Sequence, residues 1–200
     1  MISELEFDAS DKNNAIYYKE SISLLNKNKV AKYIFEANKE FYNLFGKPKD
    51  KIYLNLCDMI IDERTEEFNT KSIFIGDRII GIISFYDSEE IYYRQIFSLN
   101  YLQNDSSIDA DTISSFSKCV PVIKKKSLYL SRIAISEDFQ GKGYSTKILK
   151  HFERQARNKG YSFISLHVHF SNKKAISIYK KYGFHTESND YDYFILLKEI

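Results

Sequence analysis

The beginning of the chain carries apolar side chains at helical spacing. Ile16, Leu24 and Leu25 fall on one face of a first amphipathic segment. A second segment, from Val30 to Phe45, repeats apolar residues every three or four positions and ends at Gly46, as helices commonly do. We therefore expect two amphipathic helices in this part of the chain.

A β-hairpin is predicted next. Residues 71–75 and 79–85 are rich in β-branched and aromatic side chains, which favour strands. The connector Gly76-Asp77-Arg78 between them is typical of a turn. The two runs are therefore expected to pair as antiparallel strands.

The stretch 88–126 has a weaker pattern. Residues 89–102 are compatible with a helix, and a polar turn at 104–107 precedes a shorter helix near 113–119. Pro121 would stop that second helix, because proline cannot continue the hydrogen-bond ladder. We interpret 88–126 as a helical insertion on the substrate side.

The last third of the chain alternates strands and helices. Glycine and asparagine stand at the expected helix ends, where left-handed backbone and N-caps are common. The order strand, helix, strand, helix, strand indicates α/β layering. The expected strands are 127–135, 163–168 and 191–197, and the expected helices are 144–158 and 172–183.

Composition indicates a globular protein. The 200 residues suffice for one core, and the hydrophobic (44%) and charged (28%) fractions are ordinary for a globular chain. We therefore treat 1–200 as one domain. No stretch approaches the roughly 20 apolar residues of a membrane helix. The N-terminus lacks the basic and apolar regions of a signal peptide, so we expect a cytoplasmic protein without a membrane partner.

Charge and cysteine spacing argue against two further classes of protein. The net charge is +2, and the one dense basic run, Lys124-Lys125-Lys126, is too short for a nucleic-acid footprint. Cys57 and Cys119 lie far apart, without the spacing of a disulfide framework or a zinc site, and the four histidines do not change this. We expect neither a nucleic-acid partner nor a metal.

A glycine-rich turn, Gln140-Gly141-Lys142-Gly143-Tyr144-Ser145, connects an expected strand to an expected helix. Glycines there let successive backbone N–H groups converge at a helix N-terminus, an arrangement that binds phosphate groups. Taken alone the turn is weak evidence, because glycine is also common in simple turns. It matches neither the Walker loop, whose leading glycine is missing, nor the dinucleotide fingerprint, which needs glycine where Thr146 stands.

The turn resembles the signature of the GNAT superfamily of N-acetyltransferases, Gln/Arg-x-x-Gly-x-Gly/Ala after a strand. It departs from that signature at Ser145, which is still small enough for a close approach. A second stretch, from Asn172 through Tyr179 to Gly183-Phe184, is similar to the family's N-x-x-A-x-x-x-Y-x-x-x-G-F. Two motifs in the right order and context are more specific than either alone. The recognisable region runs from about residue 128 to 186.

The resemblance implies an α/β fold of the GNAT type. Its mixed central sheet of about six to seven strands is flanked by helices, and two central strands splay apart to bind acetyl-CoA. Residues 127–200 would form the acetyl-CoA-binding core, and residues 1–126 the acceptor-side half.

The resemblance also implies which residues hold acetyl-CoA. The pantetheine arm would pair with the main chain of Ile133, Ala134 and Ile135, where an N–H group would polarise the thioester carbonyl. The turn from Gln140 to Ser145 would hold the pyrophosphate, and Asn172 would contact the cofactor near the second splayed strand.

Tyr179 is the implied general acid, because the departing thiolate needs a proton or a hydrogen bond and a phenol can supply one. Spacing alone would favour a core tyrosine, since Tyr179 shares a helical face with Ala175 and Ile176.

His167 is a candidate general base. Alternation along the strand places it on the face opposite Leu166. Relatives that acetylate protein N-termini carry a glutamate base at this position, five residues before the motif asparagine, and imidazole suits the same role. The alternative is a surface or hydrogen-bonded strand histidine. Glu137 is another conceivable base, although it lies past the strand end and is expected to face solvent.

Two basic residues have open roles. Arg132 should point away from the Ile133 side chain, and it either contacts substrate or pairs with a carboxylate. Lys142 either contacts a cofactor phosphate or is a solvated lysine whose backbone N–H matters more.

The expected activity is direct transfer of an acetyl group from acetyl-CoA to a primary amine in a ternary complex. Neither cysteine lies in the motifs, which argues against an acyl-enzyme. The acceptor stays open among a protein N-terminus, a lysine side chain, a polyamine, an amino sugar and a small amine. The resemblance around His167 leans slightly towards the relatives that acetylate peptides. The alternative is a GNAT-like protein that binds CoA as a sensor. A monomer and a homodimer are both compatible with the sequence.

Overall fold

The computed structural model describes residues 16–20, 24–103 and 120–200, and these build a seven-stranded sheet in the order β1-β2-β3-β4-β5-β7-β6. Neighbouring strands are antiparallel except β4 and β5, which run parallel. This mixed sheet confirms the predicted fold class. The strands are β1 (Ile16–Glu20), β2 (Thr70–Ile75), β3 (Arg78–Asp87), β4 (Leu128–Ile135), β5 (Phe163–His169), β6 (His185–Asp190) and β7 (Tyr193–Glu199).

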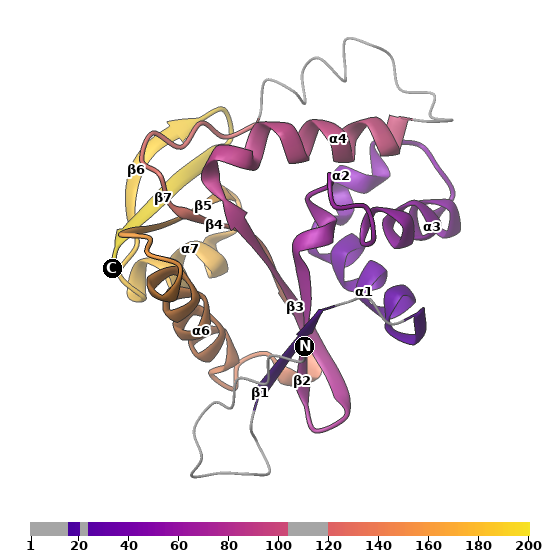
Figure 1. The fold of residues 1–200 in the computed structure, drawn as a ribbon, viewed down its shortest axis with the longest axis horizontal. Coiled ribbons are helices and arrows are strands. Elements are labelled where there is room, and N and C mark those ends of the chain that lie inside the picture. Colours follow the sequence, from indigo (N-terminus) through magenta and orange to yellow (C-terminus); the bar gives the residue numbers. More distant parts are fainter. Residues whose placement is uncertain (1–15, 21–23, 104–119) are drawn as a thin grey trace.

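Helices cover both faces of the sheet (Figure 1). We call these faces the α1–α4 face and the α6–α7 face, after the helices that pack on each. The helices are α1 (Leu24–Ala37), α2 (Lys39–Asn43), α3 (Lys49–Met59), α4 (Ile91–Gln103), α6 (Tyr144–Asn158) and α7 (Lys173–Lys181), with 3₁₀ turns η1 (Glu67–Asn69), η2 (Ser88–Glu90) and η3 (Glu137–Phe139). Among the described residues, no helix is long and apolar enough to span a membrane.

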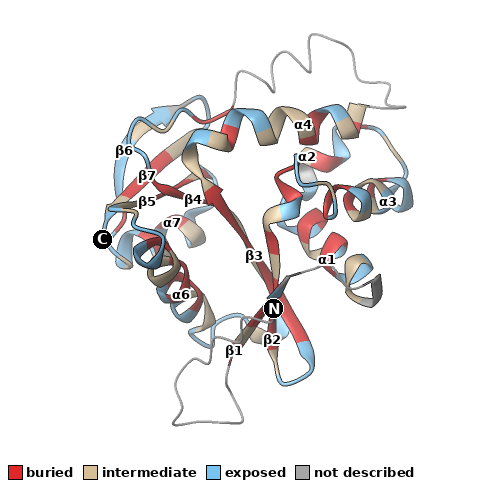
Figure 2. Cartoon of the chain, in the orientation of Figure 1, coloured by how far each residue is buried: buried red, intermediate tan, exposed pale blue. Residues whose placement is uncertain are grey.

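Side chains of β3 alternate between the two faces of the sheet and contribute to the apolar core on each face. Ile82 packs with the helices of the α1–α4 face, and its neighbour Ile83 packs with those of the α6–α7 face. Both isoleucines are fully buried, as Figure 2 shows for most of β3. Each such side chain contributes about 1.5–3 kcal/mol relative to an exposed one. The sheet is therefore held from both sides.

The prediction of a helix at the beginning of the chain is wrong for residues 16–20. Residues 16–20 form β1, where Ile16 and Tyr18 are buried and pack into the core of the α6–α7 face, while Tyr17 between them is only half-buried. This alternation has the period of a strand. The second predicted helix is interrupted at Asn38, whose φ of −144° is not helical, so α1 and α2 are separate.

Two elements were not predicted, namely α3 and β6. The hairpin is confirmed as β2 and β3, the helix at 89–102 as η2 and α4, and the last third as β4, α6, β5, α7 and β7. The polar turn at 104–107, the helix near 113–119 and Cys119 lie outside the described residues.

Candidate active site

The parallel strands β4 and β5 part in the middle of the sheet. Their ladder joins only Leu128–Leu130 to Ile164–Leu166. On its other edge β4 stays paired with β3 up to Ile135, and β5 stays paired with β7 up to His169. The facing edges of β4 and β5 beyond Leu130 and Leu166 therefore carry main-chain groups without a strand partner in the described part of the chain. Such an edge can pair with an extended, amide-bearing ligand.

The glycine-rich turn lies where β4 leads into α6. Gly141 and Gly143 have φ values of 74° and 79°, and an added Cβ on either would meet no heavy atom within 4 Å. Positive φ favours glycine, which explains both residues physically. The first helical residue is Tyr144, and Gly143 caps the helix without a side-chain hydrogen bond. The N–H groups of the first turn of a helix have no partner within the helix, and such an end can bind anions.

Gln140 braces the turn. Its Nε2 donates to the Ile135 carbonyl at 3.0 Å, and its Oε1 accepts from Lys174 Nζ at 2.9 Å. The side chain thus ties the end of β4 to α7. Lys142 is exposed, and its Nζ lies 5.5 Å from the centre of the Phe139 ring.

Asn172 caps α7, as the sequence indicated. Its Oδ1 accepts from the Ala175 N–H at 3.1 Å, which satisfies one orphan donor of the first turn. The side-chain NH₂ group of this exposed residue remains available as a donor.

Tyr179 lies on α7 and is 8% exposed in the core of the α6–α7 face, where its ring meets Phe184 edge-on. Burial raises the pKa of its hydroxyl to about 12. The described hydrogen bonds include none to this hydroxyl. Tyr179 therefore carries a protonated phenol at neutral pH, with its donor uncommitted.

His167 lies on the opposite face of β5. Leu166 and Val168 are buried on the α6–α7 face, whereas the His167 imidazole is half-buried on the α1–α4 face. Its Nδ1 is hydrogen-bonded to the hydroxyl of Tyr129, which is fully buried on β4. The two rings stack within 3° of parallel, and Tyr193 meets the imidazole edge-on. The histidine is therefore a positioned side chain at the opening.

Arg132 pairs with carboxylates, which settles the choice that the sequence left open. Its Nη2 lies 2.8 Å from Glu66 Oε1 and 3.6 Å from Glu67 Oε1, and all three side chains are nearly buried. Ile133 points to the other face, as alternation predicted. Glu137 is exposed, as expected.

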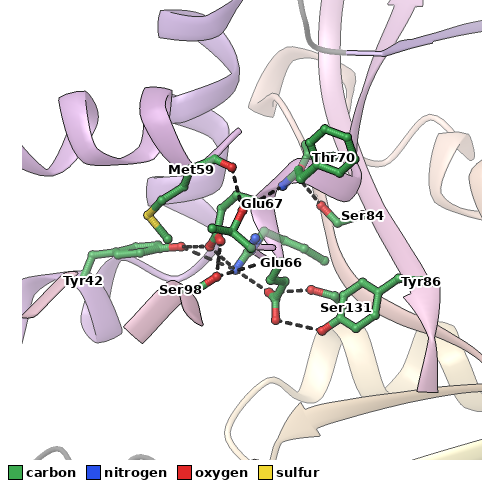
Figure 3. A network of polar contacts seen from close by, with 12 residues as sticks. Tyr42, Met59, Glu66, Glu67, Thr70, Ser84, Tyr86, Ser98 and Ser131 are labelled. Carbon is green, nitrogen blue, oxygen red and sulfur yellow. Dashed lines mark hydrogen bonds and ion pairs between the residues drawn. The ribbon is translucent and has the colours of Figure 1, made fainter. Parts of the chain in front are cut away.

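Glu66 and Glu67 form the centre of a buried polar network (Figure 3). Ser131 and Tyr86 donate to Glu66 at 2.6 and 3.0 Å. Although burial favours the neutral acid, Arg132 and these hydrogen bonds hold the pKa of Glu66 below its usual value. Burial and the neighbouring Glu66 charge raise the pKa of Glu67. The network was not predicted from the sequence, and neither was Tyr129 as the partner of His167.

Comparison with known proteins identifies the family. A family model described as the acetyltransferase (GNAT) family matches residues 31–184. The chain belongs to the GNAT family. The match spans both halves of the sheet, and it includes the glycine-rich turn and the α7 motif.

Solved structures share the GNAT fold at low sequence identity. An N-acetyltransferase from Staphylococcus aureus Mu50 has a TM-score of 0.64 and 17% identity, with 92% of this chain and 99% of that chain covered. A PaiA N-acetyltransferase from Thermoplasma acidophilum, solved in complex with coenzyme A, has a TM-score of 0.54 and 18% identity over the same shares. At these identities the likeness shows the fold.

A curated relative is similar over a short stretch. The thialysine N-epsilon-acetyltransferase of Mus musculus is 40% identical over 58 residues. The match covers 29% of this chain and 34% of that protein, so the chain matches about a third of the length of this relative.

Proposed function

We propose that this protein transfers the acetyl group of acetyl-CoA to a primary amine, by direct attack of the amine in a ternary complex. The observation that carries the proposal is the parting of β4 from β5 beyond Leu130 and Leu166, followed by an exposed glycine-rich turn at the start of α6. The unpaired strand edge suits the amides of a pantetheine arm, and the turn suits a pyrophosphate. The coenzyme A complex of the Thermoplasma relative supports this reading.

The residues present fit acetyl-CoA. Main-chain groups of Ile133, Ala134 and Ile135 would pair with the pantetheine arm, and one N–H would polarise the thioester carbonyl. The N–H groups from Gly141 to Ser145 would hold the pyrophosphate, with Gln140 as their brace. The NH₂ group of Asn172 would donate to the cofactor.

His167 takes the proton that the attacking nitrogen loses as its bond to the acetyl carbon forms. The hydrogen bond between Nδ1 and the Tyr129 hydroxyl orients the imidazole for this role. Solvent afterwards removes the proton from the imidazolium. A base oriented by a buried hydrogen-bond partner is the usual arrangement for this role.

Tyr179 stabilises the sulfur as the carbon–sulfur bond breaks. Because burial raises the pKa of Tyr179 to about 12, above the ~8.5 of an ordinary thiol, its hydroxyl acts as a hydrogen-bond donor to the developing thiolate. Water supplies the proton that completes the free thiol of CoA. One proton leaves the amine and one reaches the sulfur, so the protein is unchanged after a turnover.

An aliphatic amine is the acceptor class that the comparisons favour. The name of the mouse relative specifies acetylation of an ε-amine, and its matched stretch of 58 residues is 40% identical to this chain. We therefore place lysine-like and polyamine-like compounds ahead of amino sugars and peptide N-termini.

The proposal is tested with purified protein, acetyl-CoA and a panel of lysine-like amines, polyamines, amino sugars, peptide N-termini and other small amines. Amine-dependent release of the CoA thiol, matched by acetylated product, supports it. Saturable acetyl-CoA binding without release from any amine points to the CoA sensor instead. An absence of acetyl-CoA binding contradicts both readings.

A further inference from the structure

We propose that Glu66 is a positioning residue that fixes a β-bulge in β4 and thereby holds β4 in the shape that receives the pantetheine arm. The inference rests on the proposed function. It concerns how the opening between β4 and β5 is maintained, and it assigns Glu66 no contact with either substrate.

The bulge lies at Ser131. In the β3–β4 ladder, Phe85 pairs with Leu130 and Ser84 pairs with Arg132, so Ser131 is the extra residue. Consecutive side chains of a regular strand point to opposite faces. Here Ser131 and Arg132 both reach the same oxygen, Glu66 Oε1, at 2.6 and 2.8 Å. The bulge turns both side chains to one face, and one carboxylate oxygen holds them there.

The bulge coincides with the end of pairing between β4 and β5. Leu130 is the last residue of β4 that pairs with β5, and Ser131 follows it directly. A bulge bends its strand and increases the local twist, which directs the following residues away from a neighbour. The contacts of Glu66 with Ser131 and Arg132, which we call the clamp, therefore act at the point where the two strands separate.

Glu66 also forms a hydrogen bond with β3, the strand that pairs with β4. It lies next to η1, in the segment between α3 and β2, and is 6% exposed. Its second oxygen, Oε2, accepts from the Tyr86 hydroxyl at 3.0 Å (Figure 3). Tyr86 belongs to β3, so the carboxylate joins the two strands that carry the bulge to a segment outside the sheet.

The pair of glutamates is unsuited to binding the amine directly. Both oxygens of Glu66 are occupied by the contacts above. Both oxygens of Glu67 are occupied as well, Oε1 by Tyr42 at 3.3 Å and Oε2 by Ser98 at 2.5 Å. An ammonium group would have to displace partners from a site that is almost closed to solvent. The contacts of Glu66 with Ser131 and Arg132 therefore support the geometry of β4.

Glu67 provides a matched control. It is as buried as Glu66 and adjacent to it, but it has no contact with Ser131 and lies 3.6 Å from Arg132. Its two oxygens bond to Tyr42 and Ser98, neither of which lies on β4. Glu66→Gln removes the charge that Arg132 needs, and Glu67→Gln leaves the clamp in place.

The experiment compares Glu66→Gln and Glu67→Gln with the wild type by CoA calorimetry, acetyl-CoA kinetics and hydrogen exchange of the amides of residues 131–135. We expect Glu66→Gln to weaken CoA binding about tenfold or more and to raise KM for acetyl-CoA with a smaller change in kcat. Exchange should accelerate in residues 131–135 and not in β2. Glu67→Gln should stay within about twofold of the wild type on all three measures.

Ser131→Ala is the second variant, for the case that Glu66→Gln does not fold. It removes one hydrogen bond of the clamp and leaves Glu66 paired with Arg132. We expect about a threefold loss of CoA affinity. The inference is overturned if the folded variants keep the wild-type exchange rates and CoA affinity. It is also overturned if Glu67→Gln loses as much CoA affinity as Glu66→Gln. A wild type that fails to bind CoA contradicts the proposed function instead, and the exchange rates still report on the clamp.

Discussion

The Tyr129 hydroxyl is hydrogen-bonded to Nδ1 of His167, and the two rings lie within 3° of parallel across neighbouring strands. Tyr129 is completely buried, whereas the imidazole is half-buried. The buried hydroxyl thus fixes the orientation of the imidazole that we propose as the base. A base must be neutral to accept a proton, so activity should rise with pH through the titration of this imidazole.

His167→Gln should lower kcat by about 10²- to 10³-fold and remove the acidic limb of the pH–rate profile, because no imidazole remains to titrate. His169→Gln is the control, since His169 is exposed on the same strand and contacts Ser171. Initial rates over pH 5–9, at saturating acetyl-CoA, report both effects. An unchanged acidic limb in His167→Gln would remove this residue as the base.

Tyr179→Phe should lower kcat by about 10²- to 10³-fold, the usual cost of one transition-state hydrogen bond, while CoA affinity stays near the wild-type value. Tyr182→Phe is the matched control at the end of the same helix, because its hydroxyl bonds to Glu153. Calorimetry and turnover are measured on both variants. Since the pKa of Tyr179 is about 12, its ionisation should cause no loss of rate below about pH 11. Full turnover by Tyr179→Phe contradicts the role.

Gly143→Glu should abolish measurable CoA binding, because a negative side chain enters the anion-binding turn. Gly160→Glu separates this effect from backbone strain, since Gly160 has the same φ of 79° and equally open surroundings at the other end of α6. We expect comparable losses of melting temperature in both variants, and loss of CoA affinity in Gly143→Glu alone. Equal affinities by calorimetry would exclude the turn from the binding site.

His151 should make the fold sensitive to acid. It is 1% exposed and stacks on Tyr18 with 3.6 Å between ring centres. Burial, with the positive charges of Arg154 and Lys71, lowers its pKa to about 3. The unfolded chain binds this proton from about pH 6.5 downwards and the folded chain does not. Stability should therefore fall between about pH 6.5 and 3.

His151→Phe should flatten that part of the stability profile, because phenylalanine keeps the stack and cannot bind a proton. The slope from this one group is at most about 1.4 kcal/mol per pH unit. Urea unfolding at several pH values gives the slope for each protein. Parallel profiles for the wild type and His151→Phe would show that another group causes the loss.

The sequence predicted the elements that have strong local signals. The turn before α6 contains glycines that need positive φ, and Asn172 does cap α7. β1 was mistaken for helix because a strand of five residues is too short to establish its period. β6 was missed because it is an edge strand whose sequence, HTESND, is polar. It therefore lacks the alternating apolar residues that predict a strand.

The candidate site was predictable where it follows the family motifs and unpredictable where it depends on distant contacts. Ser131 and Glu66 are 65 positions apart, and Tyr129 and His167 are 38 apart. Adjacent glutamates in a polar stretch are normally solvated, so the pattern gave no indication that Glu66 and Glu67 are buried. Only the folded chain brings these groups together.

The most direct test of the account is a stoichiometric assay of acetyl transfer. Purified protein is incubated with acetyl-CoA and an aliphatic primary amine, and free CoA and acetylated amine are quantified together. The account predicts that both appear in a one-to-one ratio, at a rate that saturates with acetyl-CoA and collapses in Tyr179→Phe. Saturable acetyl-CoA binding with no acetylated product from any class of primary amine would contradict it.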